Sequence, residues 1–433
     1  MKYIIKCWSV CKTHRKGLSF SLLSSVLLIT TTYFTNNLPL FTGENLNQFF
    51  FTEYANTILG NQKIDNYDDV IFINTSYDGS LVPAYEDNFV VGNSKITDRK
   101  KLYDFLKLLS KSDCYKYVIL DVVFAKDDCS EYDDSLFTII NQMDKIVVAH
   151  QDSIVSTSKI NASRFGLAQF YSTIVATNFC RYEFLDPQDE RRYIPTRVYE
   201  DSYPGHKLVK YGWKWFSFYT SDGKLCNNSA FLLFHVKDPL EKFMDGLEND
   251  SSISNSSKEY GLSDYYEIHQ VYYNLGSDLI DKYQSGASSD DQFIEYNIEP
   301  LMRNKYIIIC DYKGDQHDTY CGLRPGGLII YKAIKYLEEG KHYVDWFHAF
   351  LWMLIFFVIS ICLYYNLSIL SILGRGCNKH KFLYLLSDIL SFTMVLLVCE
   401  VFFYVLTDTV HSLIIPIIYF SCLKIYQSLN QHH

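Results

Sequence analysis

The segment KYVILDVVFAKDDCSEYDDSLF (Lys116–Phe137) changes from an apolar run into a cluster of acidic residues. The run YKYVILDVVF (Tyr115–Phe124) is nearly all apolar, which is typical of a strand covered on both faces. The residues that follow, Glu131–Met143, are predicted to form a helix. Asp133 and Asp134 would lie at its start, where carboxylates satisfy free backbone N–H groups and favour the helix dipole. The segment therefore predicts a strand followed by a helix, the repeating unit of an α/β domain.

Strands and helices of the same kinds occur on both sides of this segment. Continuous apolar runs predict buried strands, and apolar residues at helical spacing predict the helices between them. This alternation favours an α/β domain with a mainly parallel sheet covered by helices. In chain order we expect a strand in Asp68–Ser76, a helix in Thr97–Ser112 capped by Thr97, the strand and helix above, a strand in Lys145–His150, a strand in Asn304–Tyr312, and a helix in Pro325–Lys341 that leads directly into a membrane segment.

The middle of the chain has weaker signals. FCRYEFLDPQDERRYIPTRVYED (Phe179–Asp201) is predicted to be a hairpin with its turn at Asp186–Glu190, because turn-forming residues separate two apolar stretches. The Ser/Asn-rich stretch Gly246–Gly261 is predicted to be a loop.

Four apolar segments have the composition of membrane spans, each of which needs about 20 apolar residues. We expect spans at 17–35, 346–370, 382–406 and 411–426, the last of which is shorter. The first is predicted to be a retained signal anchor, because no small-residue cleavage pattern follows Phe34.

The positive charges predict the orientation of these spans. Five lysines and arginines precede the first span, and the short segment 374–381 contains Arg375, Lys379 and Lys381. Because positively charged segments stay in the cytoplasm, residues 1–16, 374–381 and 427–433 are predicted to be cytoplasmic. Residues 36–344 then form the large domain on the periplasmic or extracellular side of a multi-pass protein of the cell (inner) membrane.

Charge and cysteine content restrict the possible partners. The net charge of −9, without a basic stripe, argues against nucleic acid. Six of the twelve cysteines lie in the predicted external segment, where disulfides are permitted. Six cysteines allow 15 connectivities. Cys310 and Cys321, which flank a short loop, are the favoured pair.

The acidic cluster at 121–134 has three possible roles: a metal loop, ligand contact, or helix capping and turn structure. Asp121 lies at the end of a predicted parallel strand, where ligand crevices form in open α/β sheets. Arg99 is a second candidate for ligand contact. The spacing is not that of an EF-hand, and the required glycine is absent. We favour capping and turn structure.

The loop CDYKGDQHDTYC (Cys310–Cys321) is the other candidate site. It contains Asp311, His317 and Asp318, which are candidates for ligand binding. Zinc binding, a disulfide-closed loop and an ordinary surface loop all remain open, although the spacing matches no zinc motif. No metal, no cofactor and no catalytic residue are predicted, because no catalytic motif occurs.

Three ionisable residues lie within the predicted spans. Asp388 and Glu400 are in the third span and Lys424 is in the fourth. Such groups are costly in a bilayer and usually face partners. We expect Asp388 to pair with Lys424, and Glu400 to contact another protein or a second copy, so that a homodimer is possible. The alternative for Asp388 and Lys424 is snorkelling to the interface.

The order of these motifs resembles an external sensor domain called CHASE type two (cyclases/histidine kinases associated sensory extracellular). That family has one span before the domain and usually three after it. It also has a strand ending in D-x-x-F, paired Asp before a helix, and a P-G helix near the last strand. The corresponding segments here are ILDVVF (Ile119–Phe124), DDSLF (Asp133–Phe137), KIVVAH (Lys145–His150), RRYIP (Arg191–Pro195), NKYIIIC (Asn304–Cys310) and RPGGLIIYKAI (Arg324–Ile334). The family's Trp-Pro-Trp segment is missing, and only its arginine, Arg99, is kept.

The resemblance implies a sensor of an external ligand. Only QSLNQHH follows Tyr426, so we expect no output enzyme in this chain and signalling through a separate partner protein. An envelope scaffold or assembly protein, whose external domain binds another protein, is the alternative. A membrane-bound hydrolase or transferase using Asp121 with Asp311 or His317 is a third hypothesis.

Overall fold

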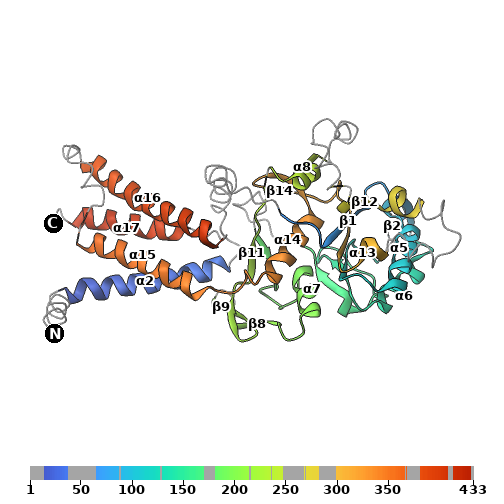
Figure 1. Cartoon of the computed structure of the whole chain (residues 1–433), viewed down its shortest axis with the longest axis horizontal. Helices are drawn as coiled ribbons and strands as arrows, with labels where there is room; N and C mark the ends of the chain where they lie inside the picture. The colour runs from blue at the N-terminus through green and yellow to red at the C-terminus, as the bar shows by residue number, and fades with distance from the viewer. Residues whose placement is uncertain are drawn as a thin grey trace.

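The computed structural model describes residues 14–37, 65–86, 89–126, 129–169, 181–213, 216–235, 237–246, 268, 270–281, 299–365, 367, 381–407 and 413–430. Two parts lie end to end along the long axis in Figure 1. One is a bundle of four helices, and the other is an α/β domain. The predicted loop at Gly246–Gly261 falls almost entirely outside the described residues.

The α/β domain is built on a six-stranded parallel sheet. Its strand order is β12-β1-β13-β4-β5-β6, and every neighbouring pair is parallel. The strands are β12 (Tyr272–Asn274), β1 (Val70–Asn74), β13 (Tyr306–Cys310), β4 (Tyr117–Asp121), β5 (Ile146–His150) and β6 (Phe165–Leu167). The expected α/β class and mainly parallel sheet are confirmed. The late strand β13 is inserted between β1 and β4.

Helices cover both faces of the sheet. On β1, Val70 and Phe72 belong to one buried cluster, whereas Ile71 and Ile73 belong to the other. Neighbouring side chains of a strand point to opposite faces, so burial of both faces requires the continuous apolar runs seen in the sequence. One face packs on α7 (Ile194–Ser202), α8 (Pro239–Asp245) and α14 (Gly326–Glu338), and the other on α5 (Arg99–Ser112), α6 (Asp133–Gln142) and the π-helix η4 (Leu275–Ile280).

The predicted helices α5, α6 and α14 are confirmed, with two corrections. Asp98, not Thr97, caps α5, and its side chain accepts hydrogen bonds from the N–H groups of Lys100 and Lys101. The predicted direct path from α14 into the membrane segment is wrong. The helix ends at Glu338, and Gly340 then adopts a φ of +68°, which breaks the helix before α15 (Trp346–Tyr364) begins.

The predicted hairpin at Phe179–Asp201 is wrong in its second half. The turn exists, because Leu185 and Arg192 form an antiparallel bridge around it. Pro195, however, lies in the first turn of α7, where its fixed φ suits a helix start. The first arm, β7 (Arg181–Glu183), pairs with β11 (Ser229–Phe231) instead.

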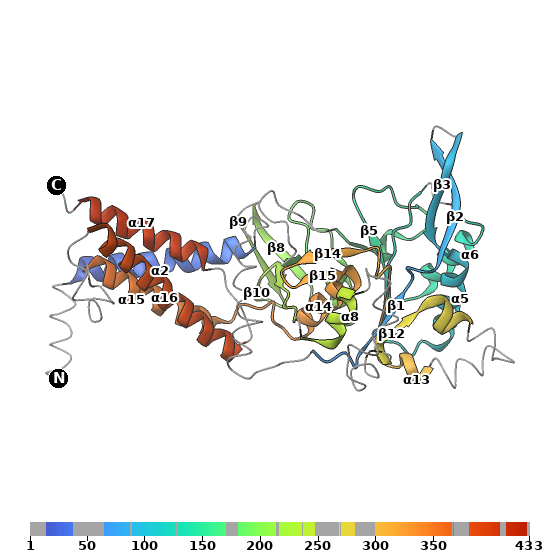
Figure 2. The same ribbon diagram turned by 90° about the horizontal axis from the view of Figure 1, so that it is seen from above.

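Smaller hairpins and short helices complete the domain. In the view of Figure 2 the β2–β3 hairpin projects from the end of the domain farthest from the bundle, whereas β8 and β9 lie beside the bundle. The remaining elements are β2 (Gly79–Glu86), β3 (Phe89–Thr97), β8 (Leu208–Trp213), β9 (Phe216–Ser221), β10 (Lys224–Cys226), β14 (Gln316–Thr319), β15 (Gly322–Pro325), η2 (Ala162–Arg164) and α13 (Glu299–Met302).

The bundle consists of α2 (Arg15–Asn36), α15, α16 (Lys381–Thr407) and α17 (Ile414–Asn430). A buried cluster joins the four helices. Among the described residues, two helices are long and apolar enough to cross a membrane, Arg15–Thr35 and Trp346–Tyr364. The apolar stretches in α16 and α17, Ile389–Tyr404 and Ile414–Leu429, are shorter. Two of the four expected spans thus have the required length and composition.

Candidate functional site

A cluster of polar side chains lies at the carboxyl edge of the sheet. Asp121 is the last residue of β4, and its register partner Cys310 is the last residue of β13. Asp315 comes from the loop that follows β13. One ligand atom of each of these three residues lies within 4.8 Å of the others, which is close enough to hold a metal ion. The Cys310 thiol is 3.6 Å from Oδ2 of Asp315.

Burial determines the protonation of this cluster. Burial, and then the nearby charge of Asp315, raise the pKa of Asp121 well above its ordinary value. Burial also raises the pKa of the Cys310 thiol. Two carboxyl groups that crowd one another favour a shared proton over two charges. The arrangement is therefore suited to a hydrogen-bonded carboxyl pair, or to a cation that replaces the shared proton.

Glycine allows the start of α14 to approach this cluster. A Cβ atom at Gly326 would collide with the Asp315 carboxylate and lie 3.2 Å from Oδ2 of Asp121. The Gly326 N–H donates to the Asp315 carbonyl at 2.9 Å. At the next position, a Cβ on Gly327 would lie 2.7 Å from the Tyr312 hydroxyl. The Gly-Gly pair thus brings the positive end of the helix dipole beside two acids.

The other predicted ligand residues of this loop are separated. His317 joins the cluster, since its Nε2 is 3.1 Å from Oδ1 of Asp315. Asp311 points elsewhere and accepts hydrogen bonds from the Ser76 hydroxyl at 2.6 Å and the Gly314 N–H at 2.7 Å. Asp318 is exposed on β14. Asp315 is the carboxylate that contacts His317 and lies beside Asp121, and the catalytic use of Asp121 with Asp311 or His317 stays a hypothesis.

Arg99 lies in a separate buried ion pair. Its Nε is 3.6 Å from Oδ1 of Asp133, and its guanidinium carbon lies 4.2 Å from the centre of the Phe124 ring. Both charged side chains are almost completely buried, so the pair joins the start of α5 to that of α6. Asp134 contacts Lys159 on the surface at 2.7 Å. Asp133 and Asp134 of the cluster at 121–134 therefore have structural partners. Asp127 and Asp128 lie outside the described residues.

The favoured disulfide is not formed. Neither Cys310 nor Cys321 forms a disulfide. Cys310 contacts Asp315, whereas the Cys321 thiol donates to the Phe234 carbonyl at 3.3 Å. Both cysteines are buried in the same hydrophobic cluster.

The structure describes the side chains of two of the three ionisable residues predicted to lie in the spans, Glu400 and Lys424. Glu400 is completely buried in the single chain, and its expected contact with another protein or a second copy stays a prediction. Lys424 is also buried, at 4% exposure, which argues against snorkelling. The side chain of Asp388 lies outside the described residues, so the Asp388–Lys424 pair stays a prediction.

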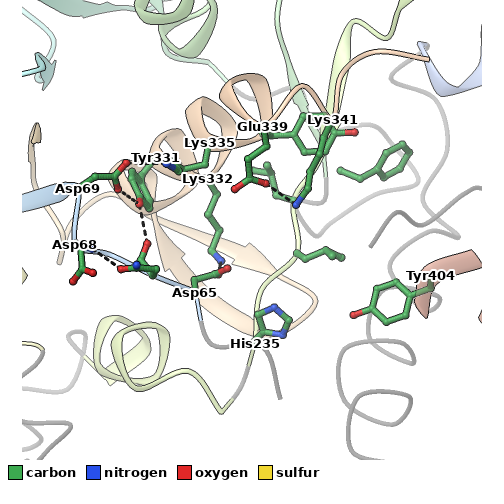
Figure 3. A pocket seen from close by; sticks show the side chains of 15 residues that line it. Asp65, Asp68, Asp69, His235, Tyr331, Lys332, Lys335, Glu339, Lys341 and Tyr404 are labelled. Carbon is green, nitrogen blue, oxygen red and sulfur yellow. Dashed lines mark hydrogen bonds and ion pairs between the residues drawn. The ribbon is translucent and has the colours of Figure 1, made fainter. Parts of the chain in front are cut away.

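A cavity of about 440 Å³ lies on the other half of α14. Figure 3 shows its lining: acids and lysines face each other beside α14, and Tyr404 of α16 closes one side. It is lined by Asp65, Asn66, Asp68, Asp69, Phe231, Leu232, Leu233, His235, Tyr331, Lys332, Lys335, Tyr336, Glu339, Lys341 and Tyr404. The cavity is therefore shared by the α/β domain and the bundle.

Each lysine of the cavity faces a carboxylate. Lys332 contacts Asp65 and lies 2.5 Å from Oε1 of Glu241. Burial raises the pKa of Glu241 to about 7, although Lys332 opposes the shift. Lys335 lies 2.8 Å from Asp69, and the Lys341 ammonium lies 2.7 Å from Glu339. The cavity is thus lined by both lysine and carboxylate side chains, and the ion pairs between them fix their positions.

The sequence analysis missed this cavity. Its one local signal is the pair of lysines at 332 and 335 inside the apolar helix GGLIIYKAIKYLE. Their partners Asp65 and Asp69 lie more than 260 positions away in the chain. A single sequence gives no indication of that pairing.

The comparisons with known proteins give no relative. The chain matches no protein-family model, no curated protein and no solved structure.

Proposed function

We propose that this chain is a membrane-anchored sensor module that binds a small polar ligand in the cavity beside α14. The observation that carries the proposal is the shared lining of that cavity. Lys332 and Lys335 belong to the α/β domain, whereas Tyr404 belongs to α16 of the bundle. A ligand there contacts both parts, so its binding energy can favour one arrangement of the domain relative to the bundle.

The cavity suits a small ligand with both signs of charge. Its volume of about 440 Å³ lies within the range of roughly 300–1,000 Å³ typical of ligand pockets. Three lysines and four acids line it. A zwitterion of the size of an amino acid or dipeptide can pair with both, so we propose this ligand class.

The membrane anchoring rests on the outer surface of the bundle. Each of its four helices has large apolar side chains exposed, among them Leu23 at 70%, Val358 at 55%, Val398 at 67% and Ile418 at 55%. Such a continuous apolar surface is expected against lipid and not against water. We propose that all four helices cross the membrane, with the α/β domain outside the cytoplasm. The order of motifs resembling a CHASE type-two sensor agrees with this arrangement.

The signal would leave the domain through the segment after α14. This segment is not a rigid helix, but it is fixed by backbone hydrogen bonds. The Asn227 N–H donates to the His342 carbonyl at 2.8 Å, and the Val344 N–H donates to the Leu225 carbonyl at 3.0 Å. A shift of α14 can therefore reach α15 through this fixed connection. The output then requires a separate partner protein.

Ligand binding is tested by thermal unfolding of the full-length protein in detergent with L-amino acids and dipeptides. We expect one class of compound to raise the unfolding temperature, and Lys335→Gln to abolish the increase. Lys159→Gln is the matched control, because it removes the same charge from an ion pair on the surface. An equal increase in the Lys335 variant, or no increase with any compound, would contradict the proposal.

One observation favours the scaffold alternative. The β2–β3 hairpin exposes Leu81, Phe89, Val90 and Val91, each at more than 60%, at the end of the domain farthest from the bundle (Figure 2). An isolated two-stranded hairpin with exposed apolar residues is suited to binding another protein. Mass spectrometry of proteins purified with the full-length chain from its native membrane separates the two functions. A signalling enzyme supports the sensor, whereas envelope assembly proteins alone support the scaffold.

A further inference from the structure

The β8–β9 hairpin has one exposed face made of large apolar side chains. In the register of the hairpin Tyr211 pairs with Phe218, and Trp213 pairs with Phe216. The rings of Tyr211 and Phe218 stack at 5.5 Å. The exposed fractions are 40% for Val209, 48% for Tyr211, 73% for Trp213, 68% for Phe216 and 41% for Phe218. The hairpin thus presents a continuous aromatic surface.

The opposite face of the hairpin is fixed to the domain. Leu208 and Tyr219 belong to the main buried cluster of the sheet, and Ser217 and Ser221 are buried. Buried residues alternate with exposed or partly exposed ones along β9, so one face of the hairpin packs on the domain. The orientation of the aromatic face is therefore determined by the fold.

Strand β9 lies against the end of the first candidate span. The rings of Phe216 and Phe34 are in edge contact, with their centres 5.8 Å apart. The Tyr219 N–H also donates to the Tyr33 hydroxyl at 3.2 Å. Figures 1 and 2, which view the molecule at right angles, both place β9 beside the end of α2 nearest the domain.

The length of α2 places this contact at the edge of a bilayer. The candidate span Arg15–Thr35 contains 21 residues, and at about 1.5 Å per residue it matches a hydrocarbon core of about 30 Å. Phe34 then lies at the outer boundary of that core. At the start of the second candidate span, Trp346 and Phe347 are each 69% exposed. Aromatic residues are enriched at this level of membrane proteins.

We propose that the aromatic face of the β8–β9 hairpin is a membrane-docking surface that inserts into the outer lipid interface. The proposal rests on the membrane anchoring of α2 and α15, and it is independent of the ligand cavity. Trp213 and Phe216 would lie between the headgroups and the acyl chains, where the apolar parts of their rings leave water. Together with α2 and α15, the hairpin would provide a third attachment that fixes the tilt of the domain on the membrane.

Depth-dependent quenching tests this contact. A small fluorescent amino acid is incorporated at position 213 of the full-length protein, which is reconstituted at one copy per nanodisc with nitroxide lipids labelled in the headgroup or deep in the acyl chain. Position 81 is the matched control, since Leu81 is exposed to a similar extent, at 70%, on the hairpin far from the bundle. Position 358 in the middle of α15 reports on membrane insertion itself.

The expected result is a large loss of fluorescence at position 213 with headgroup nitroxide and no loss at position 81. If position 358 is quenched by the deep nitroxide while position 213 behaves like position 81, the hairpin proposal is overturned and the anchoring stands. If position 358 is also unquenched, the anchoring fails as well. Shielding of position 213 only at high protein density in proteoliposomes would show that a second copy covers the hairpin, which also overturns the proposal.

Discussion

The Tyr33 hydroxyl donates a hydrogen bond to the Cys226 carbonyl at 3.0 Å and accepts one from the Tyr219 N–H at 3.2 Å. Tyr33 lies in α2, whereas Cys226 ends β10 of the α/β domain. Cys226 also forms a backbone bridge with Tyr343, just before α15. Helix α2 and the segment before α15 therefore both contact the domain at Cys226.

Removing the Tyr33 hydroxyl should weaken this junction. In Tyr33→Phe the Tyr219 N–H and the Cys226 carbonyl each lose a partner in a half-buried position. We expect a loss of about 1–2 kcal/mol in the free energy of unfolding, measured by denaturant unfolding of the full-length protein in detergent. Tyr426→Phe, at an exposed position of α17, is the control and should change little. Equal effects of the two substitutions would show that the junction does not depend on this hydroxyl.

Acidification should destabilise the segment between α14 and α15. His342 is completely buried, and burial followed by the charge of His206 lowers its pKa to about 4. The unfolded chain binds this proton near pH 6.5, so stability is lost as pH falls from 6.5 towards 4, by roughly 1.4 kcal/mol per pH unit. His342→Phe should remove this part of the pH dependence. Neither ring nitrogen of His342 has a hydrogen-bond partner among the described residues, so little else is lost.

Thermal unfolding at several pH values between 4 and 8 measures this effect. His206→Phe serves as the comparison, because the His206 ring is only half-buried. We expect His206→Phe to keep most of the dependence on pH. A pH profile of His342→Phe that coincides with that of the original protein would contradict the assignment.

The carboxyl pair at the sheet edge predicts an opposite pH dependence. Burial and Asp315 raise the pKa of Asp121, so the folded protein holds this proton to higher pH than the unfolded chain. The stability that protonated Asp121 contributes is greatest below about pH 4, the pKa of Asp121 in the unfolded chain. This stability falls as the pH rises towards the pKa of Asp121 in the folded protein. Asp121→Asn, which has a similar shape and no charge, should therefore preserve or raise stability at pH 8. Asp311→Asn, which weakens bonds to Ser76 and Gly314, should lower stability by about 1–3 kcal/mol.

Chemical denaturation of both variants at pH 5 and pH 8 separates the two acids. A large loss for Asp121→Asn at pH 8 would show that the charged form of Asp121 is required in the fold. That result would favour a bound cation among Asp121, Cys310 and Asp315 instead of a shared proton.

The core of the fold could be predicted from the sequence because its signals are local. The strand β13 must be covered on both faces, and this requirement makes Tyr306–Cys310 a continuous apolar run. Helix α5 can be predicted from the sequence because apolar residues such as Leu102 and Phe105 recur at helical spacing. The position of β13 between β1 and β4 has no local signal, since it is determined by pairing between distant segments.

The candidate site was predicted only in part for the same reason. Asp121 and His317 were identified from their positions next to strands, but Asp315 joins them only because the loop folds back on Gly326. Arg99 was predicted to be a candidate for ligand contact, and it pairs with Asp133. The sequence around Arg99 does not indicate this pairing, because Asp133 lies on a different helix and the tertiary structure brings the two together.

The cluster around Lys332 should be the most sensitive point of the cavity. Asp65, Asp238 and Glu241 place carboxylate oxygens within 4.8 Å of one another, and Lys332 contacts two of these acids. Lys332→Met leaves them without this cation, which should destabilise the folded protein by about 3–5 kcal/mol at pH 8. The remaining carboxylates then have raised pKa values, so the loss should be smaller at pH 5, where the folded protein takes up protons.

Thermal unfolding at both pH values, with two further variants, isolates the cause. Lys335→Met removes a half-exposed lysine of the same helix and should cost much less. Adding Glu241→Gln to Lys332→Met should recover part of the stability, because one of the crowded carboxylates is removed. If the double variant is instead less stable than Lys332→Met alone, Glu241 stabilises the domain through bonds other than its ion pair, such as the one from the His235 N–H.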